Sequence, residues 1–211
     1  MKFNQFHNIR KHFIKDNCEL DHIVVEGTNN VLISAPHGVS QIRLGKYKLP
    51  EIGALATALL IKQETNCFFI AKTKNNNDDA NFDEVSPYKT SIEDLIKNNN
   101  IKYIIDFHGL DSKRECDINL GTHLGNNIKN DESIFNKLYQ SLIENNFVTQ
   151  IDQPYMAGSK TISGSMANKY PNVWTLQIEI NCGITNKPEN FHKLEKLITI
   201  LTNWIKSIPQ K

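Results

Sequence analysis

Two histidines and one glutamate lie at the ends of apolar runs, where side chains of these types can hold a metal ion or move a proton. His37 follows the run Val31–Ala35, and His108 follows the run Ile101–Phe107; a glycine comes directly after each histidine. Glu179 lies within a third apolar segment near the C-terminus. If these runs are strands of an open α/β sheet, their ends are where such sheets bind ligands.

The two histidines can form a zinc site if a carboxylate joins them. Two neutral imidazoles and one carboxylate are a common catalytic zinc set, which leaves a fourth position for water. We expect Glu51 to be that carboxylate, at the start of the helical run Ile52–Glu64. An acidic residue in the first turn of a helix can instead complement the helix dipole, and this alternative stays open for Glu51.

Glu179 and Asp106 are expected to support the metal ligands. Carboxylates are rarely buried without a partner, so Glu179 in an apolar strand needs a cation, a metal or a catalytic task. A general base that takes a proton from metal-bound water fits this position, and a buried ion pair is the alternative. Asp106 and His108 are two residues apart, so they share one face of a strand, where Asp106 can orient the imidazole.

Three motifs resemble those of the N-formylglutamate amidohydrolase family. The matching pieces are SAPHG (Ser34–Gly38), DFHG (Asp106–Gly109) and QIEIN (Gln177–Asn181). More loosely, the chain is similar to phage-type poly-γ-glutamate hydrolases and to carboxypeptidase-like zinc exopeptidases. The resemblance spans residues 31–183 and implies the mixed-sheet, zinc-dependent exopeptidase/phosphorylase-like fold. It also implies that His37 and His108 bind zinc, with a glutamate between them in the ligand set, and that Glu179 is the base.

The carboxylate ligand departs from the pattern of the family. In several relatives it follows the first histidine more closely, whereas residues 39–43 of this chain contain no acid. Either an insertion over Arg43–Pro50 displaces the ligand to Glu51, or another residue binds the metal. The alternative ligands are the aspartates of the stretch NNNDDANFD: Asp78, Asp79 and Asp83.

Substrate contacts are expected from several residues near these motifs. The resemblance places an asparagine that meets the substrate at Asn81. Arg114 is expected to clamp a substrate carboxylate through two hydrogen bonds, and His123 to donate to the substrate. Lys160 is a further candidate for charge recognition. Cys182 follows Glu-Ile-Asn where the family often carries arginine, which leaves the identity of the substrate open.

These residues together predict hydrolysis of an amide bond. Zinc would polarise the scissile carbonyl, and Glu179 would pass a proton from water to the leaving nitrogen. The expected substrate is a small-molecule or peptide-like amide with a carboxylate, either an N-acyl amino acid such as formylglutamate or a γ-glutamyl amide. Two other functions remain: a catalytically silent, metal-binding domain that recognises a peptide or small acid, and an interaction module whose histidines are structural.

Strand-like and helix-like runs alternate along the chain, which predicts a three-layer α/β fold around a central mixed sheet. The residues between the first two strand-like runs, Gly-Thr-Asn-Asn, predict a hairpin turn. The expected strands are 22–26, 31–35, 67–72, 101–107, 147–151 and 173–180. The expected helices are 3–14, 52–64, 91–98 with Ser91 as N-cap, 132–145 and 188–205.

Composition narrows the class of protein. The 211 residues include 24 basic and 23 acidic ones, without the basic excess of a nucleic-acid binder. No apolar run approaches the roughly 20 residues that span a bilayer, so no membrane partner is expected. Residues 1–7 lack the apolar core of a signal peptide, which predicts a cytoplasmic protein. Four dispersed cysteines without a CxxC pair argue against a cysteine zinc site, and residues 1–211 read as one zinc hydrolase-like domain.

Overall fold

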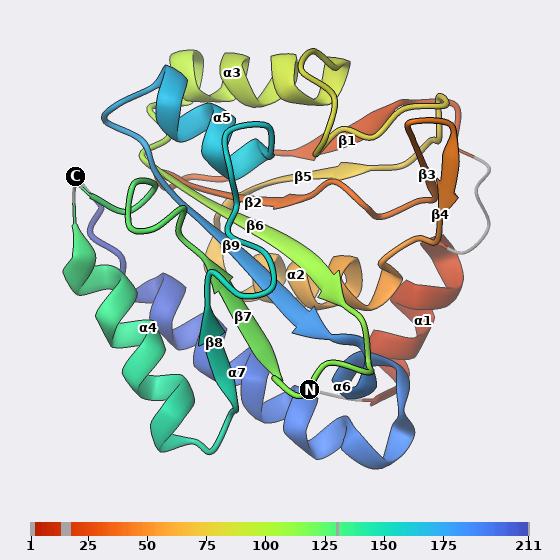
Figure 1. Ribbon diagram of the computed structural model, residues 1–211, viewed down its shortest axis with the longest axis vertical. Helices are drawn as coiled ribbons and strands as arrows, with labels where there is room; N and C mark the ends of the chain where they lie inside the picture. Colours follow the sequence, from red (N-terminus) through yellow and green to blue (C-terminus); the bar gives the residue numbers. More distant parts are fainter. Residues whose placement is uncertain (1–2, 14–17, 130, 211) are drawn as a thin grey trace.

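A mixed β-sheet forms the centre of the molecule (Figure 1). The computed structural model describes residues 3–13, 18–129 and 131–210. In these ranges the sheet consists of β1 (His22–Val25), β2 (Val31–Ala35), β5 (Phe68–Lys72), β6 (Tyr103–Leu110), β7 (Ile118–Gly121), β8 (Thr149–Ile151) and β9 (Trp174–Asn181), in the order β1-β5-β2-β6-β9-β7-β8. The central strands β5, β2, β6 and β9 are parallel, whereas β1 and β7 run antiparallel to their neighbours β5 and β9.

Helices cover both faces of this sheet. They are α1 (Phe3–Phe13), α2 (Ile52–Thr65), α3 (Pro87–Asn99), α4 (Glu132–Glu144), α5 (Ile162–Lys169), α6 (Cys182–Asn186) and α7 (Phe191–Lys206). Figure 1 shows α3 and α5 on one face and α2, α4 and α7 on the other. The predicted three-layer α/β fold is therefore confirmed. Among the described residues, no helix is both long enough and apolar enough to cross a membrane.

The central strands are buried on both faces, as their near-continuous apolar sequences predict. In β6, Ile104 packs in the apolar cluster with α3 and α5, and Ile105 packs in the cluster on the opposite face. Because side chains alternate along a strand, Asp106 and His108 lie on the same face as Ile104. The side of the sheet that carries α3 and α5 therefore also carries the polar residues of β6.

The predicted hairpin between the first two strands is wrong. β1 and β2 do not pair with each other, because β5 lies between them and pairs with both. Residues 26–30 cross the beginning of β5: Thr28 donates to the carbonyl of Asn66 at 2.9 Å, and a Cβ on Gly27 would lie 2.3 Å from the carbonyl carbon of Cys67. The turn-forming residues 27–30 therefore allow two backbone segments to pass close to each other.

Several other elements differ from their predicted bounds. α3 begins at Pro87, one turn earlier than expected, and Ser86 is its N-cap because its hydroxyl accepts from the Lys89 amide at 3.1 Å. The prediction also missed β7 and the helices α5 and α6. A short hairpin of β3 (Gln41–Arg43) and β4 (Lys46–Lys48) fills the expected insertion after the first histidine.

The segment 152–158, which follows β8, is held in place by hydrogen bonds from the loop after β7. The carboxylate of Asp152 accepts from the amides of Thr122 (2.6 Å), His123 (3.1 Å) and Leu124 (2.9 Å), and from the Thr122 hydroxyl at 2.7 Å. The side-chain amide of Asn119 adds a bond to the carbonyl of Tyr155 at 2.8 Å. The segment is therefore a fixed wall beside the sheet.

Replacing Asp152 should destabilise the protein. Asp152→Ala leaves the amides of Thr122 and Leu124 without their acceptor, whereas the His123 amide keeps its bond to the Met156 carbonyl. We expect the free energy of unfolding to fall by about 1–3 kcal/mol. Chemical denaturation measures this loss. Asp94→Ala is the matched control, since Asp94 is exposed on α3 and its carboxylate has no hydrogen bond among the described residues. An equal effect of both substitutions would contradict the anchoring role of Asp152.

Candidate metal centre and active-site cleft

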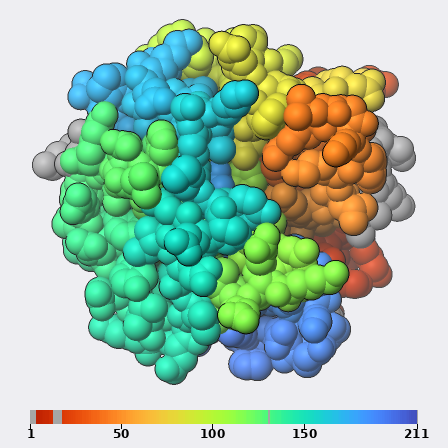
Figure 2. Space-filling model, in the orientation of Figure 1, coloured from red at the N-terminus to blue at the C-terminus, as the bar shows by residue number. Residues whose placement is uncertain are grey.

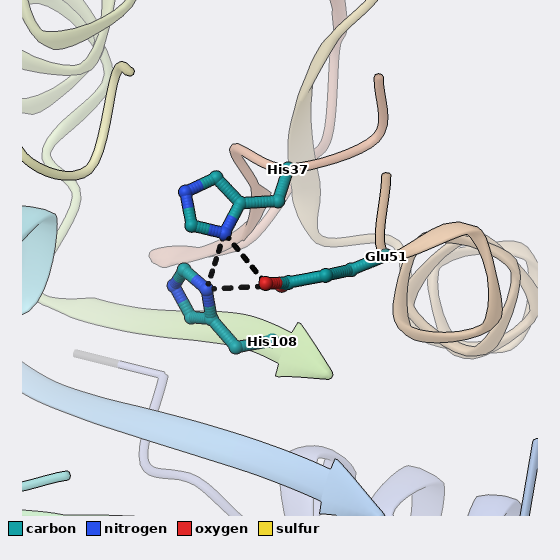
Figure 3. A group of neighbouring side chains, drawn as sticks. All are labelled: His37, Glu51 and His108. Carbon is teal, nitrogen blue, oxygen red and sulfur yellow. Dashed lines mark hydrogen bonds and ion pairs between the residues drawn. The ribbon is translucent and has the colours of Figure 1, made fainter. Parts of the chain in front are cut away.

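Three separate segments bring His37, Glu51 and His108 together. His37 follows β2, His108 lies near the end of β6, and Glu51 is the N-cap residue of α2. The backbone fixes their approach, because the Glu51 amide donates to the His37 carbonyl at 2.8 Å and the Gly109 amide donates to Glu51 Oε2 at 2.9 Å. The side chain of Glu51 makes no capping bond to its own helix and turns towards the histidines (Figure 3).

The three side chains present their ligand atoms to one point. The two Nδ1 atoms lie 3.2 Å apart, and Glu51 oxygens lie 2.9 Å from His37 Nδ1 and 3.3 Å from His108 Nδ1 (Figure 3). A tetrahedral ion with bonds of about 2.0–2.2 Å holds its ligand atoms roughly 3.3–3.6 Å apart. The observed triangle matches this size to within a few tenths of an ångström.

The outer nitrogens of both imidazoles are occupied by buried carboxylates. Asp79 lies 3.0 Å from His37 Nε2, and Asp106 lies 3.0 Å from His108 Nε2. A proton on each Nε2 satisfies these contacts and leaves a lone pair on each Nδ1. Two lone pairs and the Glu51 carboxylate then converge on one another, and such a set of acceptors fits a bound cation. Metal-binding histidines typically carry this kind of outer carboxylate.

Further contacts fix the two outer carboxylates, both of which are fully buried. The Ser34 hydroxyl donates to Asp106 Oδ1 at 2.7 Å, and the Arg43 guanidinium donates through Nε to Asp79 Oδ2 at 2.7 Å. Asp106 therefore makes the contact that its expected orienting role requires. Asp79, an alternative metal ligand by sequence, lies behind His37 and away from the ligand triangle.

Charges in this cluster shift one another's pKa values. Burial by itself would lower the pKa of both imidazoles, but the carboxylates around them raise the pKa of His37 and raise that of His108 further. Burial acts to raise the pKa of Glu51, and the two histidines outweigh it and lower this pKa well below its usual range. The raised pKa values favour protonated imidazoles, and a metal ion that binds here would have to displace those protons.

Glu179 stands next to the ligand triangle on the neighbouring strand. It lies opposite His108 in the pairing of β6 with β9, and it is 5% exposed. Burial raises the pKa of its carboxyl to about 7. The side-chain amide of Gln177 donates to Glu179 Oε1 at 2.8 Å, which fixes the carboxylate and leaves Oε2 to act on a ligand.

These side chains form the floor of a cleft of about 300 Å³. In Figure 2 a recess lies between the orange hairpin of β3 and β4 and the teal segment around residues 152–160. The lining residues are His37, Arg43, Lys48, Glu51, Asn81, Phe82, His108, Gly109, Pro154, Tyr155, Met156, Ala157, Gly158, Lys160, Thr161, Gln177 and Glu179. The volume is at the small end of the range for ligand sites.

Two of the expected substrate contacts lie outside the cleft lining. Arg114 is exposed in the loop after β6, where its carbonyl accepts from the Asn181 side chain at 3.0 Å. The backbone amide of His123 donates to the carbonyl of Met156 at 2.6 Å and so supports the cleft wall. In contrast, Asn81 and Lys160 do line the cleft.

The other two aspartates of the loop before α3 have structural contacts. Asp78 pairs with the buried ammonium of Lys72 at 2.6 Å, and Asp83 accepts from the Asp79 amide at 2.8 Å. Neither belongs to the ligand triangle found among the described residues.

Sequence reasoning missed several lining residues, chiefly Arg43 and Phe82. Both lie in segments that reach the cleft only through the fold of the hairpin and of the loop before α3. Gln177 was also missed, although its position two residues before Glu179 puts it on the same face of the strand.

No family model matches the chain, and no curated protein sequence matches it. Solved structures share its fold. A gene product, Atu2144, from Agrobacterium tumefaciens superposes with a TM-score of 0.68 at 12% identity, over 95% of this chain and 100% of that one. The N-formylglutamate amidohydrolase from Ralstonia eutropha JMP134 gives 0.57 at 12% identity, over 89% and 96%. A bacteriophage poly-gamma-glutamate hydrolase gives 0.57 at 13% identity, over 90% and 88%.

These likenesses confirm at the level of the fold the resemblance found in the three motifs. Sequence identities this low do not identify the roles of individual residues. We infer those roles from the geometry of the cleft.

Removing either imidazole should abolish metal binding. We expect about one zinc ion per chain in the wild type and a loss of zinc in both His37→Ala and His108→Ala, because two remaining ligands cannot complete the set. Elemental analysis of the purified proteins measures the metal content. His192→Ala is the control, since His192 lies on α7 and outside the ligand triangle. Zinc-free wild type after incubation with zinc would contradict the assignment.

The affinity for zinc should rise with pH. The pKa values of His37 and His108 are raised in the metal-free protein, so protons compete with the metal until the pH exceeds those values. We expect the affinity to increase by about tenfold per pH unit for each proton displaced. Competition with a chelating indicator at about pH 6 and about pH 8 measures the change. An affinity that does not vary between these conditions would disagree with the protonated cluster.

Proposed function

We propose that residues 1–211 form one zinc-dependent hydrolase domain that cleaves an amide bond in an N-acyl amino acid or in a γ-glutamyl or other peptide-like substrate with a carboxylate. The observation that carries this proposal is the position of Glu179. A buried carboxylate with one free oxygen lies beside the His37, Glu51 and His108 triangle in a cleft open to small ligands. Metal ligands and a proton acceptor are thereby combined in one site.

Zinc is the metal that this ligand set favours. Imidazole and carboxylate ligands in a tetrahedral arrangement suit zinc, and three protein ligands leave one position for water or substrate. A zinc ion held by His37, Glu51 and His108 would supply Lewis acidity towards the scissile carbonyl and increase the acidity of water. Asp79 and Asp106 keep both imidazoles in the orientation that this requires.

Glu179 moves the proton in this mechanism. Burial raises the pKa of its carboxyl, which strengthens the carboxylate as an acceptor for a proton of attacking water; the carboxyl then gives that proton to the leaving nitrogen. The bond from Gln177 occupies Oε1, so the proton is transferred at Oε2. Burial of the carboxyl is the physical reason that it can both accept and donate a proton.

The cleft supports a small amide substrate. Asn81 uses its carbonyl oxygen to accept from the Ile162 amide at 2.8 Å, so its side-chain nitrogen is left to donate to a substrate oxygen. Two solved structures with this fold are named as an N-formylglutamate amidohydrolase and a poly-gamma-glutamate hydrolase, which agrees with amide hydrolysis. The proposal of zinc as the metal rests on the geometry of the centre.

Glu179→Gln should remove activity without removing zinc. We expect kcat/KM to fall by about 10²–10⁴-fold, because the amide cannot accept the proton of water. Release of free amine from N-formyl-L-glutamate, N-acetyl-L-glutamate and γ-glutamyl-p-nitroanilide measures the rate, and elemental analysis measures the zinc. Glu144→Gln, at the exposed end of α4, is the control.

Two outcomes would contradict this proposal. Full activity of Glu179→Gln would exclude the general base. A wild type that binds zinc and hydrolyses none of the three amides would favour a catalytically silent metal-binding domain.

A further inference from the structure

We propose that Arg43, Phe82 and Lys160 form a recognition site for the acidic group of the substrate, set on the cleft wall away from the metal centre. This inference rests on the proposed function, because it assigns the part of the substrate that does not react. It specifies the substrate class as an acidic amide whose free carboxylate is separated from the scissile bond. The three residues are called the Arg43–Phe82–Lys160 clamp below.

The clamp brings two cations to one aromatic ring. The guanidinium carbon of Arg43 lies 5.0 Å from the centroid of the Phe82 ring, and the Lys160 ammonium lies 5.3 Å from the same centroid. All three residues line the cleft, and they come from the β3–β4 hairpin, the loop before α3 and the loop before α5. Each cation is attracted to the electron-rich face of the ring, so Phe82 favours the placement of both cations in this part of the cleft.

Buried contacts hold the clamp in position. Arg43 donates through Nε to Asp79, which also accepts from the metal-site histidine His37. The ammonium of Lys89, which is 4% exposed, donates to the carbonyls of Asp83 at 2.6 Å and Lys160 at 2.7 Å. It therefore ties the loop that carries Phe82 to the loop that carries Lys160. Such preorganisation reduces the cost of ordering side chains when a ligand binds.

Both cations retain capacity to bind an anion. Within the described part of the chain, Lys160 has no ion pair, and Arg43 uses its Nε for Asp79, so its terminal nitrogens can face a carboxylate. A guanidinium and an ammonium together supply the charged donors that a carboxylate accepts. The exposed Lys160 lies where an anion can enter from solvent.

The charge distribution of the cleft sets the orientation of the substrate. Its floor carries the ligand triangle and the carboxylate of Glu179, and the clamp carries the positive charge of the wall. Opposite charges attract and like charges repel across a cleft of this kind. A substrate with both an amide and a carboxylate therefore places the amide over the floor and the carboxylate against Arg43 and Lys160.

Binding of two small acids to the zinc-loaded full chain tests the clamp. Glutarate carries two carboxylates, and glutaramate replaces one of them by a neutral amide of the same size. We expect wild type to bind glutarate about 10- to 100-fold more tightly, because the second carboxylate gains charged hydrogen bonds. Isothermal titration calorimetry measures both dissociation constants.

Variants at Lys160 show whether the clamp causes the preference for glutarate over glutaramate. In Lys160→Met the preference for glutarate should fall to less than about threefold, and Lys160→Arg should restore most of it, because the charge returns. Lys46→Met is the control: Lys46 is exposed on the same hairpin but does not line the cleft, so the preference should remain. Elemental analysis confirms equal zinc content in all variants.

A wild type that binds both acids alike, or binds neither, would overturn the clamp, and so would an undiminished preference in Lys160→Met. These results differ from a failure of the proposed function. If no amide is hydrolysed but the preference for glutarate depends on Lys160, the result supports the clamp and contradicts the proposed hydrolase function. If amides are hydrolysed but the protein shows no preference for an acid, the result supports the hydrolase function and contradicts the clamp.

Discussion

The convergence of three electron-pair donors on one point is the constraint that organises this molecule. His37 Nδ1, His108 Nδ1 and the Glu51 carboxylate lie within 2.9–3.3 Å of one another, and buried carboxylates fix the opposite side of each imidazole. Acceptors packed this closely repel one another unless protons or a cation lie between them. The folded chain therefore has a site that fits a cation, and a metal ion bound there would compensate for the energy of assembling it.

The sheet supplies the means of assembly. Parallel β2, β6 and β9 end at the same edge, so residues near their C-terminal ends meet even though they are far apart in sequence. The pairing of β6 with β9 sets Glu179 opposite His108, and the start of α2 delivers Glu51 to both histidines. Buried charges such as Asp79 and Asp106 are costly unless they are paired, and each has an imidazole as its partner. Strands thus carry His108, Asp106 and Glu179, whereas His37 lies in the turn directly after β2 and Asp79 in the loop before α3.

The sequence predicts the centre better than it predicts the substrate contacts. Apolar strands followed by His-Gly locate His37 and His108, because the ends of strands in such folds share one edge. Alternation along a strand places Asp106 behind His108. Arg114 was chosen for its nearness in sequence to His108, yet the loop after β6 leaves it outside the cleft lining. No local pattern indicates Arg43 or Phe82, whose positions depend on how the hairpin and the loop before α3 pack.

The same reasoning explains the errors in the fold. Turn propensity is local, so Gly-Thr-Asn-Asn predicted a hairpin, whereas β1 gains its hydrogen bonds from β5, which comes more than 40 residues later. Long-range pairing decides between these arrangements, because β2 is buried only when both β5 and β6 flank it. Segments whose role is set by distant partners are the ones that local patterns cannot assign.

Electrostatics connects the metal centre to the wall of the cleft. Asp79 accepts from both His37 and Arg43, so one buried carboxylate orients a metal ligand and also holds a cation of the clamp. A bound dication would add positive charge at the floor and so favour an acidic substrate there. The metal and the clamp then act in the same direction on an anionic ligand. The proposed metal centre and the proposed clamp are thus linked through a single side chain, because Asp79 contacts both His37 and Arg43.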